Sequence, residues 1–254
     1  MEKVIIILFG LVWGSFLNVV IYRLPRGQSL VRPPSSCPRC GKRIRAYDNI
    51  PVLSFLLLGG RCRSCGTRIS VVYPVVEILT ALCFLLLYNQ YSLSLHFFAS
   101  CLFASALIAL GFIDYFHQIL PDEITLPGLL LALLYAFLRP DLSLRQALIG
   151  AVAGASFLLI IYTAYYFLRR KEGLGMGDVT MMLFVGAYVG WLKAFLTLVL
   201  ASLAGAAVGL FLIYFRKKDL HFALPFGTFL APAAFFSLLW GERVITAYLG
   251  IYKQ

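Results

Sequence analysis

Charged residues are scarce in this sequence. Only 13% of the 254 residues are Asp, Glu, Lys or Arg, whereas 61% are hydrophobic. A soluble globular domain contains about 25% charged residues, so the shortage of charge excludes an ordinary soluble domain. Apolar runs of about 15–23 residues recur along the chain, and runs of that length cross or nearly cross a bilayer. We therefore expect an all-α polytopic membrane protein that forms one helical bundle.

Acidic residues are scarcer still. The chain has 11 Asp and Glu residues against 22 Lys and Arg residues, which gives a net charge of +11. Binding to nucleic acid would explain such an excess, but the positive residues gather in a few loops between apolar runs. In a membrane protein, this clustering marks the cytoplasmic loops. We therefore expect contact with membrane lipid and no nucleic-acid partner.

Other absences narrow the possible functions. The sequence has no internal repeat and no low-complexity tract. Its first apolar run lacks an A-x-A-like cleavage site and continues into "NVVIYRLP", which indicates a membrane anchor rather than a signal peptide. The three histidines, His96, His117 and His221, belong to no common motif. A Ser/His or Cys/His nucleophile therefore has no support.

Eight apolar runs are expected to form about eight transmembrane helices. They cover about residues 4–22, 71–88, 95–113, 124–138, 146–168, 179–192, 194–215 and 224–241. Eight crossings place both termini on the same side of the membrane. The loops on the other side are 23–70, 114–123, 169–178 and 216–223. They hold 16 of the 22 Lys and Arg residues, so the positive-inside rule makes this side cytoplasmic.

Only one of these loops is long enough to form a subdomain outside the membrane. We therefore expect three parts: a first transmembrane helix at 1–22, a cytoplasmic loop domain at 23–70 and a transmembrane core at 71–254.

Two C-x2-C pairs lie in the long loop, "CPRCG" at 37–41 and "CRSCG" at 62–66. Paired thiols at this separation are typical of a four-cysteine zinc site. The predicted ligands are Cys37, Cys40, Cys62 and Cys65. Two disulfides or four reduced thiols are the alternatives, and a cytoplasmic location argues against disulfides. Four thiolates leave no open position for a substrate, so we expect the metal to be structural.

Two aspartates lie where apolar runs meet the predicted cytoplasmic side. Asp114 ends the third run and Asp178 begins the sixth. Two adjacent carboxylates do not both ionise readily, so one can activate water while the other donates a proton to a carbonyl oxygen. From the residues alone, a catalytic pair, an ion or proton pathway and a structural role all stay open.

The residues around these aspartates have simpler interpretations. Asp122 and Glu123 precede the fourth run, where negative charge stabilises a helix N-terminus. We expect Glu77, about one turn into the second run, to be a structural hydrogen-bonding partner. We expect Gly175 and Gly177, which precede Asp178, to let the backbone turn and to let an extended substrate approach.

Several motifs occur together in an order that resembles the bacterial prepilin peptidases, also called type IV leader peptidases. "GSFLNVVIYRLP" at 14–25 resembles the family's opening motif, and "YPVVEILTAL" follows the cysteine loop. "IDYFHQILPDEITLP" at 113–127 is similar to the segment that carries the first catalytic aspartate. "GLGMGD" at 173–178 is similar to the G-x-G-D motif, and "LPFGTFLAP" at 224–232 resembles the family's C-terminal Pro-Phe-Gly segment.

The resemblance implies an aspartyl endopeptidase of the bacterial inner membrane, with its active site on the cytoplasmic side. The family cleaves the leaders of type IV prepilins and of type II secretion pseudopilins after a glycine. Many members also N-methylate the new N-terminus with S-adenosylmethionine. Carried over by position, Asp114 and Asp178 are the catalytic pair, Gly175 and Gly177 are the motif glycines, and the four loop cysteines hold Zn²⁺.

Three positions depart from the family's pattern. Thr180 stands where Lys is common, Val72 stands where Arg is common, and Gly59 stands where Arg is frequent. These departures bear on substrate contacts and on methylation rather than on the aspartates. Two alternative functions remain: a proton-coupled transporter with a zinc-stabilised loop, and an intramembrane protease for substrates other than pilins. The transporter is disfavoured because both aspartates lie at one face of the membrane.

The charge distribution yields a test of topology. We expect single cysteines introduced as Gln118→Cys and Gly173→Cys, in a background without other reactive thiols, to resist a membrane-impermeant thiol label added to intact cells. An Asn89→Cys variant, in a loop expected on the outer side, is the matched positive control. Labelling at position 118 or 173 from outside intact cells would contradict the predicted orientation.

Overall fold

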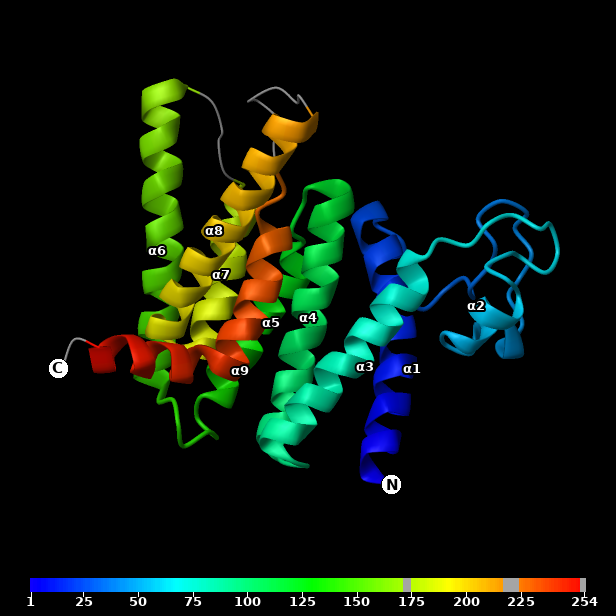
Figure 1. Cartoon of the computed structure of the whole chain (residues 1–254), viewed down its shortest axis with the longest axis horizontal. Coiled ribbons are helices and arrows are strands. Elements are labelled where there is room, and N and C mark those ends of the chain that lie inside the picture. The colour runs from blue at the N-terminus through cyan, green and yellow to red at the C-terminus, as the bar shows by residue number, and fades with distance from the viewer. Residues whose placement is uncertain (171–174, 217–223, 252–254) are drawn as a thin grey trace. The chain divides into compact units, whose positions relative to one another are not determined.

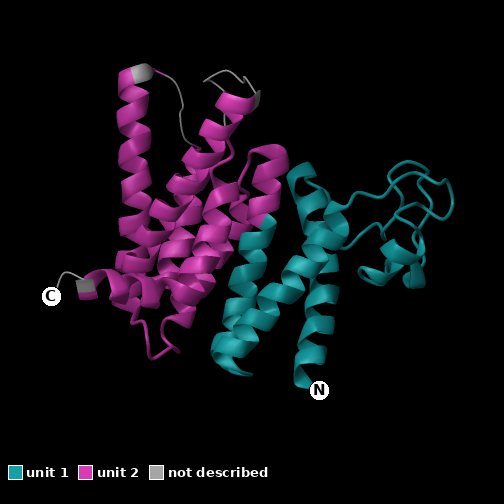
Figure 2. Ribbon diagram, viewed as in Figure 1, with its two compact units in different colours: residues 1–109 teal, residues 110–254 magenta. Residues whose placement is uncertain are grey.

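The computed structural model describes residues 1–170, 175–216 and 224–251 (Figure 1). Nine α-helices make up most of this described part. Its only extended pairings are two isolated bridges, Ser36–Arg43 and Arg61–Arg68. The prediction of an all-α fold is therefore confirmed. The chain divides into two compact units, residues 1–109 and 110–254 (Figure 2), and each is described by itself.

The first unit is built on a close pairing of two helices. α1 (Glu2–Arg23) lies along α3 (Val72–Tyr91), and the two glycines of α1 that face α3 make this approach possible. A Cβ atom on Gly10 would lie 2.6 Å from the Cα atom of Ala81, and one on Gly14 would lie 2.7 Å from the Cα atom of Glu77. Small residues that let backbones approach closely are typical of helix packing in membranes.

The rest of the first unit consists of a long loop and part of another helix. The loop contains the short helices η1 (Leu24–Arg26), η2 (Ala46–Asn49) and α2 (Leu53–Leu57). Residues 95–109 of α4 (Leu95–His117) complete the unit. Trp13 of α1 donates a hydrogen bond of 2.8 Å from Nε1 to Ser105 Oγ of α4. This bond satisfies the polar end of a large side chain within an apolar bundle.

The second unit begins with the last turns of α4 and continues through five further helices. They are α5 (Asp122–Tyr135), α6 (Leu144–Arg169), α7 (Met176–Val189), α8 (Trp191–Arg216) and α9 (Gly227–Ile251). α7 packs against α5, α6, α8 and α9, and the side chains of its residues 178–189 are mostly buried. α7, which carries the second predicted catalytic aspartate in its first turn, is therefore the central helix of this unit.

A glycine pair holds α6 and α7 in close contact. A Cβ atom on Gly186 would lie 2.1 Å from the carbonyl oxygen of Gly150, and one on Gly150 would lie 2.3 Å from the carbonyl oxygen of Gly186. No Cβ atom fits at such distances without moving backbone. The position of α7 along α6 therefore depends on the absence of side chains at these two residues.

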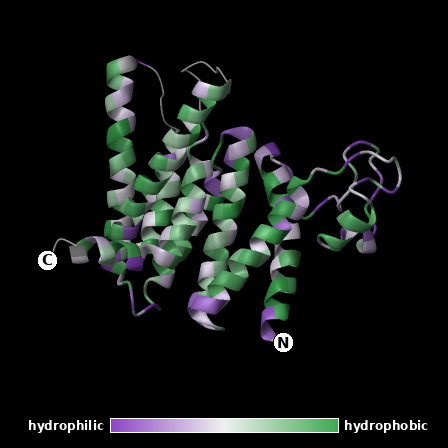
Figure 3. Ribbon diagram, viewed as in Figure 1, coloured by the Kyte–Doolittle hydropathy of each residue, from purple (hydrophilic) through white to green (hydrophobic). Residues whose placement is uncertain are grey.

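Apolar residues cover most of the helices, and hydrophilic residues concentrate in the long loop and near helix ends (Figure 3). Five helices of the described residues are long and apolar enough to cross a membrane. They are Glu2–Arg26, Val72–Tyr91, Leu95–His117, Leu144–Leu168 and Trp191–Phe215. A shorter apolar helix covers Met176–Val189. The multi-pass architecture is thus confirmed, whereas crossings by α5, α7 and α9 stay predictions.

The glycine contact yields a test of stability. Gly186→Ala should lower the unfolding temperature of the purified protein and destabilise it by about 1–3 kcal/mol, because α6 and α7 must separate to admit the methyl group. The matched control is Gly205→Ala in α8, where the new Cβ atom would meet Phe229 at an ordinary distance of 3.6 Å. Alanine favours a helix over glycine, so this control should melt no lower than the wild type. Equal melting of the two variants would contradict the close contact.

Candidate functional site

The four cysteines of the long loop converge on one point. Their sulfur atoms all lie within 4.8 Å of one another. Cys37 and Cys65 have sulfurs 3.8 Å apart, which is too long for a disulfide but close to the edge of a tetrahedron with metal–sulfur bonds of about 2.3 Å. All four cysteines are free. The arrangement could therefore hold a metal ion, as the spacing predicts.

The two cysteine pairs share one local geometry. In each, a glycine N–H donates to the carbonyl oxygen of the first cysteine: Gly41 to Cys37 and Gly66 to Cys62, both at 2.9 Å. Both glycines have a φ of +68°, a left-handed conformation that glycine adopts without strain. The N–H groups of Cys40 and Arg39 lower the pKa of the Cys37 thiol to about 6. This thiol is thus poised to be a thiolate, the form that binds metal.

Glu77 connects the loop to α3. Its side chain is buried, and Oε2 accepts a hydrogen bond of 2.7 Å from the backbone N–H of Val52. Val52 has a φ of +60°, which is unusual for a β-branched residue. The carboxylate stabilises this strained turn immediately before α2. Glu77 thus acts within the first unit as a hydrogen-bonding partner of the loop.

Asp114 lies in the last turn of α4 and is only 5% exposed. Its Oδ2 atom accepts a hydrogen bond of 2.8 Å from the backbone N–H of Thr228 and one of 3.2 Å from Thr228 Oγ1. Gly227 also lies against this carboxyl group, since a Cβ atom there would lie 3.0 Å from Asp114 Oδ2. Gly227 and Thr228 begin α9, so the carboxyl group of Asp114 faces the positive end of that helix.

Asp178 lies in the first turn of α7 and is 6% exposed. Its Oδ2 atom accepts a hydrogen bond of 3.2 Å from the backbone N–H of Gly175, the residue that caps the helix. This is half of a capping box, because glycine has no side chain with which to return the bond. Asp178 therefore also lies at the positive end of a helix.

The structure brings the two aspartates into one neighbourhood. The carboxyl groups of Asp114 and Asp178 are near enough to interact through their charges. Leu120 packs between the two helix starts: a Cβ atom on Gly227 would lie 3.0 Å from its Cδ2, and one on Gly177 would lie 2.8 Å from its Cβ. Leu120, Gly177 and Gly227 thus pack together where the helices of the two buried acids begin or end.

These contacts give one of the motif glycines a packing role, and the approach of a substrate to them stays a prediction. Gly175 has a φ of −76°, which any residue can adopt, so the turn does not require glycine there. Gly177 is needed because a side chain would collide with Leu120. The first residues of "GLGMGD", at 173 and 174, and His221 lie outside the described residues.

The other acids near the site do not join the pair. Asp122 and Glu123 are exposed in the first turn of α5, as the helix-terminus interpretation predicts. Thr125 Oγ1 donates to Asp122 Oδ1 at 3.3 Å and lies 3.5 Å from Thr180 Oγ1. Thr180 in turn donates to the carbonyl oxygen of Gly177 at 3.0 Å. Thr180, which stands where the family commonly has Lys, therefore supports the backbone of the G-x-G-D turn.

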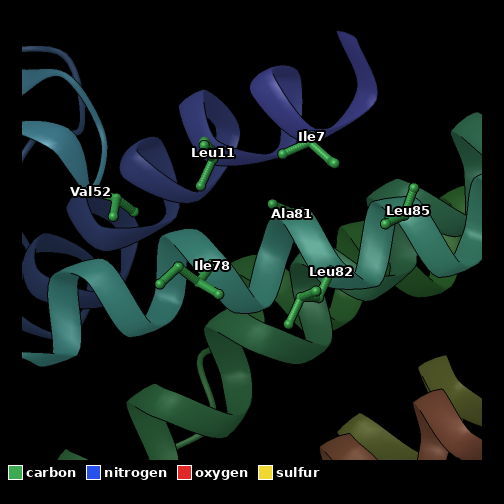
Figure 4. A pocket seen from close by; sticks show the side chains of 7 residues that line it. All are labelled: Ile7, Leu11, Val52, Ile78, Ala81, Leu82 and Leu85. Atoms are coloured by element: carbon green, nitrogen blue, oxygen red, sulfur yellow. The ribbon is translucent and has the colours of Figure 1, made fainter. Parts of the chain in front are cut away.

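A surface groove of the first unit offers no comparable chemistry. It is lined only by apolar side chains, which come from α1, α3 and the residue before α2 (Figure 4). They are Ile7, Leu11, Val52, Ile78, Ala81, Leu82 and Leu85. A groove with no polar side chain cannot activate water or bind a charged ligand. The candidate chemistry therefore belongs to the buried acids.

Sequence reasoning did not identify three residues of this site: Gly227 and Thr228, which lie against Asp114, and Leu120, which packs against Gly177 and Gly227. Gly227 and Thr228 belong to "LPFGTFLAP", which carries the resemblance at the C-terminal end. The motif gave no indication that its amide and hydroxyl groups donate to Asp114. Only the fold reveals a contact between residues 114 positions apart.

The fold and the site define a polytopic helical membrane protein with a buried pair of carboxylic acids and a four-cysteine loop. Comparison with known families agrees with this class. The bacterial peptidase A24 N-terminal domain matches residues 8–91, and the type IV leader peptidase family matches residues 101–210.

Curated relatives align over nearly the whole chain, and three of them are named prepilin leader peptidase/N-methyltransferase. The protein from Pseudomonas putida is 39% identical over 92% of this chain and 89% of its own length. The Aeromonas hydrophila protein is 39% identical over 96% and 93%, and the Pseudomonas aeruginosa protein is 38% identical over 96% and 92%. No solved structure matches the chain. The chain belongs to the type IV leader peptidase family.

The cysteine geometry yields a test by elemental analysis. We expect about one metal ion per chain in protein purified under reducing conditions without chelator, and we expect Cys37→Ser to lose it. The matched control is Cys83→Ser, because Cys83 is buried in α3 outside the cluster. A metal content near zero in the wild type, or full retention by Cys37→Ser, would contradict a four-cysteine metal site.

Proposed function

We propose that this protein is a membrane aspartyl endopeptidase that removes leader peptides from type IV prepilins and type II secretion pseudopilins, with Asp114 and Asp178 as its catalytic pair. The observation that carries the proposal is that these two acids are buried, each at a helix start, and that Leu120 lies against both helix starts. Membership of the leader peptidase family, and the names of its relatives, supply the substrate class.

The chemistry is hydrolysis without a covalent intermediate. One ionised carboxylate takes a proton from water as the water oxygen attacks the carbonyl carbon of the substrate. The protonated partner donates its proton to the carbonyl oxygen, which gives a tetrahedral diol. Transfer of a proton to the amide nitrogen then lets the C–N bond break, and the carboxyl groups return to their starting state. Two acids that share one proton suit both roles.

The proposed reaction takes place at the cytoplasmic face of the bacterial inner membrane, with cleavage after a glycine, and the charge distribution and the resemblance support this location. Sixteen of the 22 Lys and Arg residues lie in the loops on the side where Asp114 and Asp178 lie in the predicted topology. We also propose membrane lipid as a partner, because five of the described helices are apolar and long enough to cross a membrane. Within the proposed division into 1–22, 23–70 and 71–254, the last part contains the catalytic pair.

Two cofactors belong to the proposal. Zinc is the metal that a tetrahedral set of four thiolates favours, and with all four positions filled by the protein it stabilises the loop rather than the reaction. The name of the relatives includes N-methyltransferase, so we also propose N-methylation of the new N-terminus. S-adenosylmethionine would supply the methyl group, and we assign no residue of this chain to its binding.

Substitution of the two aspartates tests the proposed function. Asp114→Asn and Asp178→Asn should each lower the rate of prepilin cleavage by at least about 10²–10⁴-fold, because asparagine keeps the shape of the side chain but cannot exchange the proton. Cleavage by the purified protein is followed by the loss of the leader from the substrate. Asp122→Asn and Glu123→Gln are the matched controls and should retain substantial activity.

Metal content and unfolding temperature distinguish a lost function from a lost fold. Both Asn variants should match the wild type in these two properties. Near-normal cleavage by either Asn variant would contradict a catalytic role for the aspartyl pair and would favour the ion-pathway interpretation instead.

A further inference from the structure

The hydrogen bonds around the two acids are unequal, and we propose that Thr228 is a positioning residue that holds Asp114 as the water-activating member of the pair. This inference rests on the proposed function. Thr228 acts through Asp114 and is not itself in contact with the reacting atoms.

Among the residues that the structure describes, Asp114 receives more donors than Asp178. The Oδ2 atom of Asp114 accepts from the backbone N–H of Thr228 at 2.8 Å and from its hydroxyl at 3.2 Å. The side chain of Asp178 accepts from the backbone N–H of Gly175 at 3.2 Å. Hydrogen bonds to a charged carboxylate favour the charged form. The proton that the pair shares therefore belongs with Asp178, and Asp114 is the ionised base.

The same contacts fix the orientation of the Asp114 carboxylate. The two bonds from Thr228 both go to Oδ2 and hold this oxygen towards the start of α9, so we assign the attacking water to Oδ1. The Thr228 hydroxyl also lies 3.3 Å from the carbonyl oxygen of Gly111. A hydroxyl hydrogen can satisfy one acceptor at a time, and the bond to a carboxylate is the stronger of the two.

The close approach of α9 to Asp114 depends on Gly227. A Cβ atom at this position would lie 3.0 Å from Asp114 Oδ2 and 3.0 Å from Leu120 Cδ2. The absence of a side chain at 227 lets the next residue, Thr228, present both its amide and its hydroxyl to the same oxygen. The Gly-Thr pair thus forms a built cradle for one carboxylate oxygen.

Two substitutions of Thr228 isolate the hydroxyl. Thr228→Val keeps the shape of the side chain and the backbone N–H but removes the O–H, whereas Thr228→Ser restores it. We expect Thr228→Val to lower kcat for prepilin cleavage by about 10- to 100-fold, the range for a hydrogen bond to a charged group. KM should stay within about twofold, because the hydroxyl does not contact substrate. Thr228→Ser should recover most of the lost kcat.

Thr197→Val is the matched control. Thr197 is fully buried in the second unit, and its hydroxyl donates to the carbonyl oxygen of Lys193 at 2.8 Å in α8, away from the acids. This variant should keep the wild-type kcat. All three variants are checked for metal content and unfolding temperature, so that a folding defect is recognised.

Three results would overturn the inference: a wild-type kcat for Thr228→Val, an equal loss of kcat in Thr228→Val and Thr228→Ser, or a change confined to KM. In each case, Asp114→Asn and Asp178→Asn would still be inactive if the proposed function holds. Failure of the wild type to cleave any prepilin would instead remove the proposed function itself.

Discussion

Two carboxyl groups buried among apolar helices must find hydrogen-bond donors, and the arrangement of the second unit depends on this constraint. An isolated buried carboxylate is strongly unfavourable, and Asp114 and Asp178 are each about 95% buried. Each is stabilised by the free N–H groups at the start of a helix. Asp114 uses the start of α9, and Asp178 uses the start of α7, its own helix. The unit therefore needs both helix starts in one place.

Glycine residues, which have no side chain, make this placement possible. Gly177 and Gly227 let the two helix starts close around Leu120, and the Gly150–Gly186 contact holds α7 against α6. In a membrane, such close packing replaces the hydrophobic driving force that operates in water. The site and the stability of the bundle thus depend on the same kind of residue. A larger side chain at any of these glycines would displace a helix that carries or supports an acid.

Local patterns in the sequence predicted much of this structure. The cysteine cluster follows from the two C-x2-C pairs. The helices follow from apolar runs whose ends shift by only a few residues, except that α9 ends at Ile251 rather than at 241. α7, for example, covers Met176–Val189 rather than 179–192. Asp114 and Asp178 became candidates through their places at the ends of apolar runs, and the family resemblance assigned them as a catalytic pair. Thr228 and Leu120 could not be assigned, because their contacts join segments far apart in the chain. The packing of Gly177 against Leu120 could not be predicted for the same reason.

The central claim is that Asp114 and Asp178 act as one unit on a tetrahedral intermediate. The most direct test measures the affinity for a prepilin peptide in which a hydroxyethylene group replaces the scissile peptide bond. Transition-state analogues bind about 10²–10⁸-fold more tightly than substrates. The reference is the affinity of the inactive Asp114→Asn variant for the unmodified peptide, which this variant does not cleave. Wild-type protein should bind the hydroxyethylene peptide at least about 100-fold more tightly than this reference. Both Asn variants should lose that advantage. Equal affinity of the hydroxyethylene peptide for the wild type and both Asn variants would contradict a shared catalytic pair.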